Sequence, residues 1–235
     1  MKHPNLTILY YTSNTISDFF MKNIQDQILM AVDETPIISV SQKPINFGQN
    51  ICVGNIGRSA YNIYKQVLIA AKEAKTEYVA TAEDDVLYPK EHFEYRPKGD
   101  VFAYDTNKWS IYTWTKPPIF SYKPRVNMTS LICRRESLIK TLEERFAKYP
   151  DPNNIPTHYF GEPGRFELHL GITGVVKERI QTEVSHIMFS TEEALGFENL
   201  GFRKAHSNVR ANELPDWGTA ESVLQVYINY DKIKA

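Results

Sequence analysis

Three consecutive acidic side chains, Glu83, Asp84 and Asp85, separate one apolar, strand-like run from a second apolar pair. Like charges side by side repel one another unless water, cations or hydrogen bonds compensate them. Carboxylate oxygens suit hard cations such as Mg²⁺ or Mn²⁺, which proteins usually hold with one or two carboxylates and the phosphates of a substrate. The cluster therefore indicates either a metal and phosphate site or a solvated turn whose acids cap the next segment.

The segments before these acids alternate between strand and helix patterns. Strands are expected where β-branched and aromatic residues cluster, and helices where apolar residues recur every three to four positions. The expected elements are strands at 5–13, 35–44 and 76–82 and helices at 16–32 and 54–75. Strand, helix and strand in this order build a parallel sheet with crossover helices. Ligands of such sheets bind beyond the carboxyl ends of the strands, where residues 12–14, 42–44 and 83–85 fall.

The second half of the chain is less regular. Residues 100–114 alternate like a pair of strands, and residues 135–150 predict an amphipathic helix that Pro150 ends. The apolar face of this helix is formed by Leu138, Leu142 and Phe146. Residues 151–167 form a loop too long for a simple connection, which favours a functional or mobile segment. The polar, glycine-punctuated residues 195–218 suit a lid over a site.

Length and composition fit one globular domain. The chain has 235 residues, 42% of them hydrophobic, and a net charge of -1, so no overall basic field favours nucleic acid. No apolar stretch approaches the ~20 residues of a membrane span and the N-terminus lacks a secretory pattern, so we expect a cytoplasmic protein without a membrane span. Cys52 and Cys133 are far apart, so we expect buried thiols rather than a disulfide or a zinc site.

Over about its first 95 residues the sequence resembles the family-2 glycosyltransferases of the GT-A fold. The resembling elements are the first strand, the second strand, the following helix and the strand with the acids: LTILYYTSN, SVSQKP, GNIGRSAYNIYKQVLIAAKEA and YVATAEDDVLYP. In that family a strand-end D-x-D or E-D-D motif holds a metal under the diphosphate of a nucleotide sugar. The resemblance implies an α/β fold with a mixed, mainly parallel sheet flanked by helices.

The resemblance also implies roles for the acids. Asp85 would ligate Mn²⁺ or Mg²⁺, and Asp84 would contact the sugar or ribose of the donor. Glu83 replaces the first Asp of the common pattern, so it either shares this work or shapes the turn.

Five further residues become candidates for donor binding. The loop after the first strand would face the base and ribose through Thr12 and Asn14, which could instead cap the helix that follows. Gln42 and Lys43 occupy the comparable place after the second strand, where the alternative is a surface turn. Arg58 stands in a glycine-flanked helix entry, a suitable place to meet an anion, although it could be an ordinary exposed arginine.

Inverting transfer needs a general base for the acceptor hydroxyl, and related enzymes take it from an acid in the second half. Glu167 is the preferred candidate, because Phe166 and Leu168 would surround it with apolar groups that raise the pKa of a carboxyl. Glu162, in a turn shaped by Gly and Pro, is the second candidate. The alternative is that both are ordinary loop acids.

Two further roles follow from the resemblance. His186 would complete the metal site, although a lone His in an apolar run is more often a core residue. The rivals for this role are His158, His169 and His206. Arg203 and Lys204, beside a glycine, would clamp the leaving diphosphate, since cations stabilise its developing charge. A solvated basic patch is the alternative.

Aromatic and basic residues mark the middle of the chain. Trp109, Tyr112 and Trp114 alternate along one segment and Trp217 lies near the C-terminus, which favours core packing over a sugar-binding groove. The segments YRPKGD, KPRVN and CRRE add positive charge that could face a phosphorylated or nucleic-acid acceptor. The acceptor is left open between a glycan, a small molecule and a modified nucleic acid.

The sequence thus predicts one domain, residues 1–235, with a nucleotide-sugar-binding half at 1–95 and an acceptor-binding half with a C-terminal lid at 96–235. The predicted function is metal-dependent transfer of a sugar from a nucleotide-diphosphate donor, in the first place a UDP-sugar, to an acceptor hydroxyl with inversion. Two alternatives are a nucleotidyl or phosphoryl transferase on the same fold and a non-catalytic module that binds nucleic acid or glycans. Sugar nucleotidyl transferases carry a Gly-rich N-terminal loop, which YYTSNTIS does not match.

Overall fold

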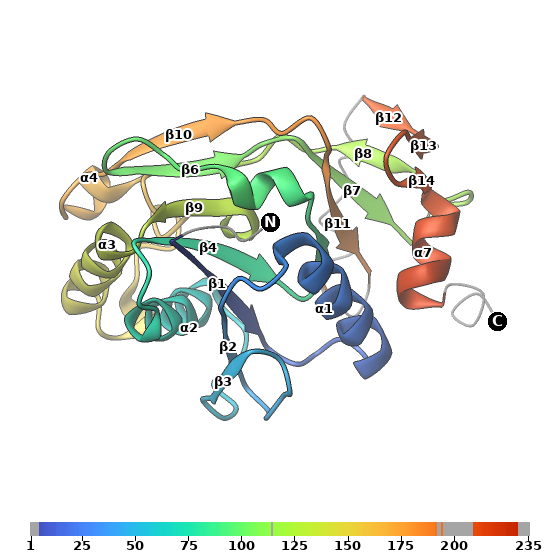
Figure 1. Ribbon diagram of the computed structural model, residues 1–235. Helices are drawn as coiled ribbons and strands as arrows, with labels where there is room; N and C mark the ends of the chain where they lie inside the picture. Colours follow the sequence, from blue (N-terminus) through green and yellow to red (C-terminus); the bar gives the residue numbers. More distant parts are fainter. Residues whose placement is uncertain (1–4, 114, 192–193, 195–208, 230–235) are drawn as a thin grey trace.

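A seven-stranded sheet forms the centre of the computed structural model, which describes residues 5–113, 115–191, 194 and 209–229 (Figure 1). Its strand order is β10-β6-β9-β4-β1-β2-β3. The four strands of the first half are β1 (Leu6–Thr12), β2 (Ile37–Ser41), β3 (Gln49–Cys52) and β4 (Tyr78–Glu83). They pair in parallel with one another. This confirms the predicted strands, to which the structure adds β3.

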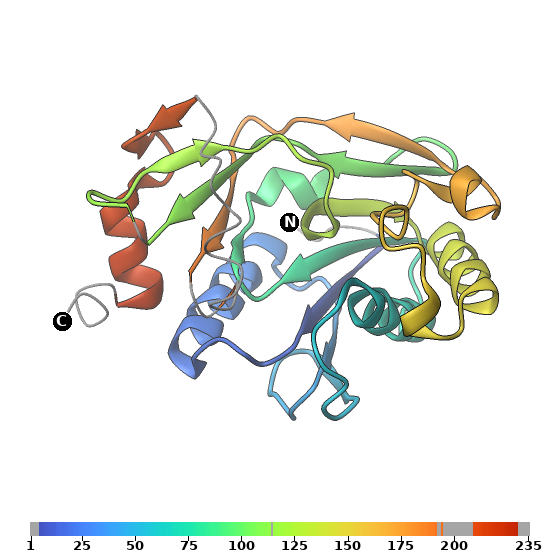
Figure 2. The ribbon, with the colours of Figure 1, turned by 180° about the vertical axis from the view of Figure 1, so that it is seen from behind.

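Helices cover both faces of this sheet. They are α1 (Asp18–Val32), α2 (Ala60–Glu73) and α3 (Arg135–Lys148). Successive side chains of a strand point to opposite faces. Helix α1 covers one face of the sheet, and α2 and α3 cover the other (Figures 1 and 2). Accordingly Ile8 and Tyr10 of β1 join the core beneath α1, while Leu9 and Tyr11 join the core beneath α2 and α3. The mixed, mainly parallel sheet flanked by helices is the predicted fold class.

The second half completes the central sheet and adds a second one. Strands β6 (Val101–Asp105), β9 (Leu131–Arg134) and β10 (Val176–Ile180) extend the first sheet. A five-stranded sheet has the order β12-β8-β7-β11-β5. Its strands are β5 (Val86–Leu87), β7 (Lys108–Tyr112), β8 (Phe120–Tyr122), β11 (His186–Ser190) and β12 (Arg210–Ala211). The predicted strand pair at 100–114 is wrong as a pair, because β6 and β7 belong to different sheets.

Short elements complete the described fold. They are the 3-10 turns η1 (Lys90–Glu94), η2 (Met128–Ser130) and η3 (Pro152–Asn154), the helices α4 (Glu167–Leu170) and α7 (Ala220–Ile228), and the strands β13 (Glu213–Leu214) and β14 (Gly218–Thr219). Helix α7 packs against α1 and shares its core. Within the described ranges, no helix is long and apolar enough to cross a membrane.

Aromatic and cysteine side chains are placed mainly as predicted. Tyr112 is buried, and Trp109 and Trp217 pack against the core beneath α1, which confirms core packing. Trp114 lies outside the described residues. Cys133 is buried, but the prediction for Cys52 is wrong, because it ends the edge strand β3 and is exposed.

Candidate functional site

A cleft of about 920 Å³ opens at the carboxyl ends of β1 and β4 and continues between the two sheets. It is bounded by four acids, six cations and several uncharged polar groups. The acids are Glu83, Asp84, Asp85 and Glu162, and the cations are Arg58, Lys123, Arg125, Arg165, Lys177 and Arg179. A concave site with convergent polar groups at this place in an α/β sheet is the expected location of ligand binding.

Three of these acids, Glu83, Asp84 and Asp85, lie where the chain leaves one sheet and enters the other. β4 of the first sheet ends at Glu83, and β5 of the second begins at Val86. Asp84 and Asp85 therefore form the whole connection. The backbone carbonyl of Asp85 accepts a hydrogen bond from the amide of Phe189 at 2.8 Å, which ties this turn to β11. The turn is thus fixed at both ends by sheet pairing.

Hydroxyl groups of β1 hold two of the acids. Tyr11 donates to the Glu83 carboxylate, and Thr12 Oγ1 donates to Asp84. Burial raises the pKa of Glu83 to about 7, with Asp84 adding to the rise and the Tyr11 hydroxyl opposing it. Burial also raises the pKa of Asp84, against the effects of Thr12 and Arg58. Without a further positive charge, burial thus disfavours the ionised forms of Glu83 and Asp84, which fits a site that a hard cation would complete.

The loops after β1 and β2 are joined by one side chain. Asn14 Oδ1 accepts hydrogen bonds from the amides of Gln42 and Lys43 at 2.8 and 2.9 Å. Gln42 in turn donates to the Gly57 carbonyl at 2.9 Å and accepts from two amides of the loop before α2. Thr12 and Gln42 line the cleft, whereas the described lining includes neither Asn14 nor Lys43. Ser17 caps α1, so capping by Thr12 or Asn14 does not occur.

The N-terminus of α2 faces the same cleft. Ser59 caps this helix, and Arg58 lies directly before it with its guanidinium donating to the Ala194 carbonyl at 2.6 Å. Gln66, about two turns further along the helix, donates to the carbonyls of Thr12 and Val40 at 3.0 and 2.9 Å. These bonds hold the ends of β1 and β2 against α2. A helix N-terminus beside a cation is a favourable setting for phosphate.

A basic wall belongs to the second half of the chain. Lys177 and Arg179 are two residues apart on β10, so their side chains project from the same face. Both are exposed and line the cleft together with Arg125, which precedes η2. Glu162 is half-buried in this region and forms an ion pair with Arg165 at 3.5 Å.

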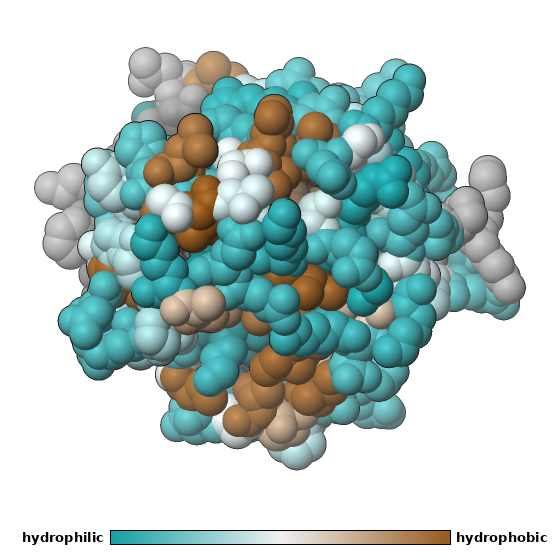
Figure 3. All heavy atoms as spheres, turned by 90° about the vertical axis from the view of Figure 1, so that its left-hand side faces the viewer, coloured by the Kyte–Doolittle hydropathy of each residue, from teal (hydrophilic) through white to brown (hydrophobic). Residues whose placement is uncertain are grey.

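Glu167 occupies a different environment from the one that the sequence suggests. It begins α4 and pairs with the fully buried guanidinium of Arg145, which also donates to the Gly161 carbonyl at 2.6 Å. The described cleft-lining residues do not include Glu167. The ion pair joins α3 to the start of α4, and the hydrogen bond to Gly161 joins α3 to the loop before α4. Figure 3 shows this end of the molecule, with hydrophilic residues interspersed among apolar ones. Of the two predicted base candidates, the cleft contains Glu162.

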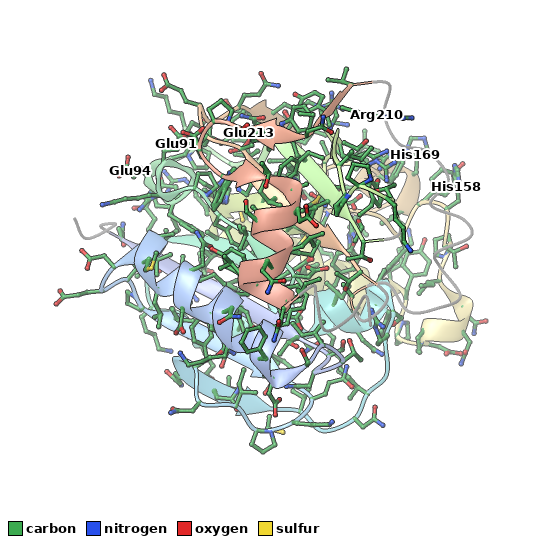
Figure 4. The ribbon with its side chains drawn as sticks, turned by 90° about the vertical axis from the view of Figure 1, so that its right-hand side faces the viewer. Glu91, Glu94, His158, His169, Arg210 and Glu213 are labelled. Atoms are coloured by element: carbon green, nitrogen blue, oxygen red, sulfur yellow. The ribbon has the colours of Figure 1, made fainter. Side chains whose placement is uncertain are left out.

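His186 likewise lies outside the described lining of the cleft. It begins β11, is fully buried, and lies beside His92 of η1 and Asp105 at the end of β6. This triad is placed so that it could hold a metal ion. The alternatives to His186 that the sequence offers include His158 and His169. Both are exposed and lie across the molecule from Glu91 and Glu94 of η1 (Figure 4). His206, Arg203 and Lys204 lie outside the described residues.

Sequence reasoning missed Lys108, a buried cation behind the cleft. It begins β7 and donates to Asn127 and, at 3.1 Å, to the Arg125 carbonyl. Burial lowers the pKa of Lys108 to about 7, although Asp105 and Glu83 oppose that shift. A lysine at an inward position of an alternating strand was the available signal. Its amine fixes the loop that carries Arg125, one residue of the basic wall.

Comparisons with known proteins give structural likenesses at low identity. No protein-family model and no curated protein matches the sequence. One similar solved structure is a glycosyltransferase involved in the glycosylation of the major capsid of PBCV-1, at TM-score 0.46 and 10% identity, covering 79% of this chain and 92% of that one. Another is S. aureus TarS, residues 1–349, in complex with UDP-GlcNAc, at TM-score 0.44 and 10% identity, covering 81% of this chain and 59% of that one. The chain spans 37% of the longer TarS structure, at TM-score 0.42 and 11% identity, with 82% of this chain covered.

The raised pKa of Glu83 predicts a pH-dependent stability difference. An acid whose folded pKa lies above its ordinary value of 4.5 destabilises the fold progressively as pH rises from there to about 7. Glu83→Gln removes that ionisation and keeps an acceptor for Tyr11. With chelator present, we expect the Tm of the variant to exceed that of the unaltered chain by about 5 °C at pH 8. At pH 4.5 we expect the two Tm values to match.

Thermal unfolding followed by circular dichroism measures this difference. Glu73→Gln, which changes an exposed acid at the end of α2, serves as the control and should show no pH-dependent gain. A difference between the Glu83 variant and the unaltered chain that is the same at both pH values would contradict the assignment.

Proposed function

We propose that the chain is a metal-dependent glycosyltransferase that moves a sugar from a nucleotide-diphosphate donor, UDP-linked in the first place, to an acceptor hydroxyl with inversion. The observation that carries the proposal is the composition of one cleft. Strand-end acids and a helix N-terminus with a cation occupy its first side, and a further acid among cations occupies its second. In this proposal the donor binds mainly to residues of the first half, 1–95, and the acceptor to residues of the second half, 96–235.

The first side suits a nucleotide diphosphate. Asp85 would hold Mn²⁺ or Mg²⁺, which would neutralise the diphosphate and stabilise its charge as it leaves. In place of the sugar or ribose contact that the resemblance implies for Asp84, we propose that Asp84 shares this cation with Asp85. Arg58 and the amides at the start of α2 would bind phosphate oxygens. Thr12 and Gln42 line the part of the cleft where base and ribose would lie. Arg203 and Lys204 remain proposed contacts to the leaving diphosphate.

Glu162 is the proposed general base. It would accept the proton of the acceptor hydroxyl, whose oxygen then forms the new bond to the anomeric carbon. The bond from that carbon to the diphosphate oxygen breaks, and its electron pair departs with the nucleotide diphosphate. Because the acceptor oxygen attacks the face of the anomeric carbon opposite the departing diphosphate, one such displacement inverts the anomeric centre. Arg165, whose guanidinium lies 3.5 Å from the Glu162 carboxylate, would orient that carboxylate.

The basic wall suggests the nature of the acceptor. Lys177, Arg179 and Arg125 line the same cleft as the acids, and the first two lie on β10, which β6 and β9 separate from β4. A neutral sugar offers three exposed cations only uncharged acceptors, whereas a phosphate group offers stronger, charge-assisted hydrogen bonds. We therefore propose an acceptor that carries a phosphate near its reactive hydroxyl.

The donor assignment predicts cation-dependent nucleotide binding. We expect UDP with Mn²⁺ to raise the Tm by several degrees, and Asp85→Asn to abolish that gain because one charged ligand is lost. Transfer or hydrolysis of a UDP-sugar should fall about 10²-fold or more in the variant. Thermal-shift and nucleotide-release assays measure the two effects, with Glu73→Gln as the control.

Three outcomes of this screen would contradict the donor assignment. A Tm gain with nucleoside triphosphates but with no diphosphate would indicate a nucleotidyl or phosphoryl transferase. Binding of glycans without hydrolysis or transfer from any donor would indicate a non-catalytic module. A gain that persists in Asp85→Asn would remove Asp85 from the site.

The two second-half acids predict opposite phenotypes. Glu162→Gln should lower kcat about 10²–10⁴-fold while UDP binding and Tm stay unchanged, because only a proton acceptor is lost. Glu167→Gln should instead destabilise the fold by about 3–5 kcal/mol, because it leaves the buried Arg145 guanidinium without its counter-charge. Steady-state kinetics and urea unfolding separate the two. The same kcat loss in a stable Glu167→Gln protein would return the base role to that residue.

The acceptor proposal predicts a selective loss of acceptor binding. In the double variant Lys177→Gln and Arg179→Gln, we expect the KM for a phosphorylated acceptor to rise about 30-fold, since two charged contacts are lost and each is worth about 1 kcal/mol at an exposed site. The donor KM should not change. A panel of paired acceptors, each with and without a phosphate group, measures this. Equal use of both members of every pair would contradict the proposal.

A further inference from the structure

Three buried ligand-type side chains meet outside the cleft, where η1, β6 and β11 come together. Asp105 Oδ2 lies 3.7 Å from His92 Nδ1 and 3.7 Å from His186 Nδ1. All three side chains are fully buried, and one candidate ligand atom of each lies within 4.8 Å of the others. None of the three appears among the described residues that line the cleft. The cluster is therefore separate from the proposed donor site.

Within the part of the chain that the structure describes, both imidazoles lack hydrogen-bond partners. Neither nitrogen of His92 nor either nitrogen of His186 has a partner among the described residues, although all four atoms are buried. Buried polar atoms are nearly always paired, because an unpaired one loses its hydration without compensation. Two neighbouring histidines with the same deficit point to a group that both would bind.

Asp105 is already held in a fixed orientation. Its Oδ1 accepts from the Asn107 amide at 2.8 Å, and its Oδ2 accepts from Thr182 Oγ1 at 2.7 Å. Outer partners of this kind orient the ligands of metal sites. Oδ2 faces both imidazoles, so a cation between the three would bind a carboxylate oxygen that needs no rearrangement.

We propose that His92, Asp105 and His186 form a second metal site, which takes a borderline transition-metal ion of the Zn²⁺ type. Zn²⁺ binds nitrogen and carboxylate oxygen at about 2.0–2.2 Å, so neighbouring tetrahedral ligands lie about 3.3–3.5 Å apart, close to the observed 3.7 Å. Mg²⁺ does not suit this set, because it prefers six oxygen ligands and retains water. The site is buried against Tyr88 and Phe93, which indicates a structural role.

The position of this site connects it to the acidic turn. Asp105 belongs to the seven-stranded sheet and His186 to the five-stranded sheet. His186 begins β11, which pairs with β5, the strand that directly follows Asp85. η1, which carries His92, follows β5 along the chain. A metal at this point would link the two sheets behind the cleft and fix the turn that carries the acids.

The test uses the full chain without an affinity tag, stripped with chelator and then reconstituted with Zn²⁺ or Co²⁺ alone. We expect elemental analysis to find one tightly held metal ion per chain, and the Co²⁺ form to show the absorption bands of tetrahedral Co²⁺. The Tm of the metal-loaded protein should be several degrees above that of the stripped protein. Asp105→Asn and His186→Gln should each weaken metal binding at least 10-fold. His158→Gln, which changes an exposed histidine, and Asp85→Asn, which changes the cleft, should retain the metal ion.

Two results would overturn the proposal. The first is a stripped chain that takes up no Zn²⁺ or Co²⁺, with an unchanged Tm. The second is loss of the bound metal ion in Asp85→Asn with retention in His186→Gln. Should the triad variants not fold, X-ray absorption of the zinc-loaded unaltered chain counts the imidazole ligands directly: two are expected, and fewer would overturn the proposal. Because no nucleotide takes part, these outcomes are independent of the donor experiments.

Discussion

The crowding of three carboxylates in the turn between β4 and β5 is the constraint around which the site is arranged. Tyr11 and Thr12 of the neighbouring strand donate to the first two acids, and Arg58 offsets part of the charge on the second. The pKa of Glu83 is nevertheless raised to about 7. A fold selected for stability alone would avoid this arrangement, whereas a cation and a diphosphate would complete it. In the proposed donor site, the bound divalent cation would offset the charge of these carboxylates.

Long-range hydrogen bonds keep that site in place from three sides. Gln66 of α2 joins the ends of β1 and β2, and Asn14 joins the loops that follow them. The amide of Phe189 in β11 holds the carbonyl of Asp85. On the opposite wall, buried Lys108 fixes the loop with Arg125. Because these bonds come from elements far apart in the chain, a loss of packing in either sheet would move the acids relative to the basic wall.

The sequence predicted the first half well because its signals are local. Helical spacing gave α1 and α2, β-branched runs gave β1, β2 and β4, and strand order alone located Asp84 and Asp85 at the ligand-binding edge. The second half depends on pairing between distant segments. β6 and β7 alternate alike but enter different sheets, and the choice between Glu162 and Glu167 depends on Arg145, which reaches Glu167 from another helix. His92 and Asp105 gave no local signal, since only the fold brings them to His186.

The central claim is that the acidic turn and a cation together bind the donor's diphosphate, and crystallography of the chain soaked with Mn²⁺ and UDP tests it most directly. An anomalous difference map recorded at the manganese edge locates the cation without reference to the fold. The account predicts a peak beside the carboxylates of Asp84 and Asp85, in contact with the diphosphate oxygens of UDP. UDP bound in the cleft with no manganese peak at these carboxylates, or UDP bound elsewhere, would contradict it.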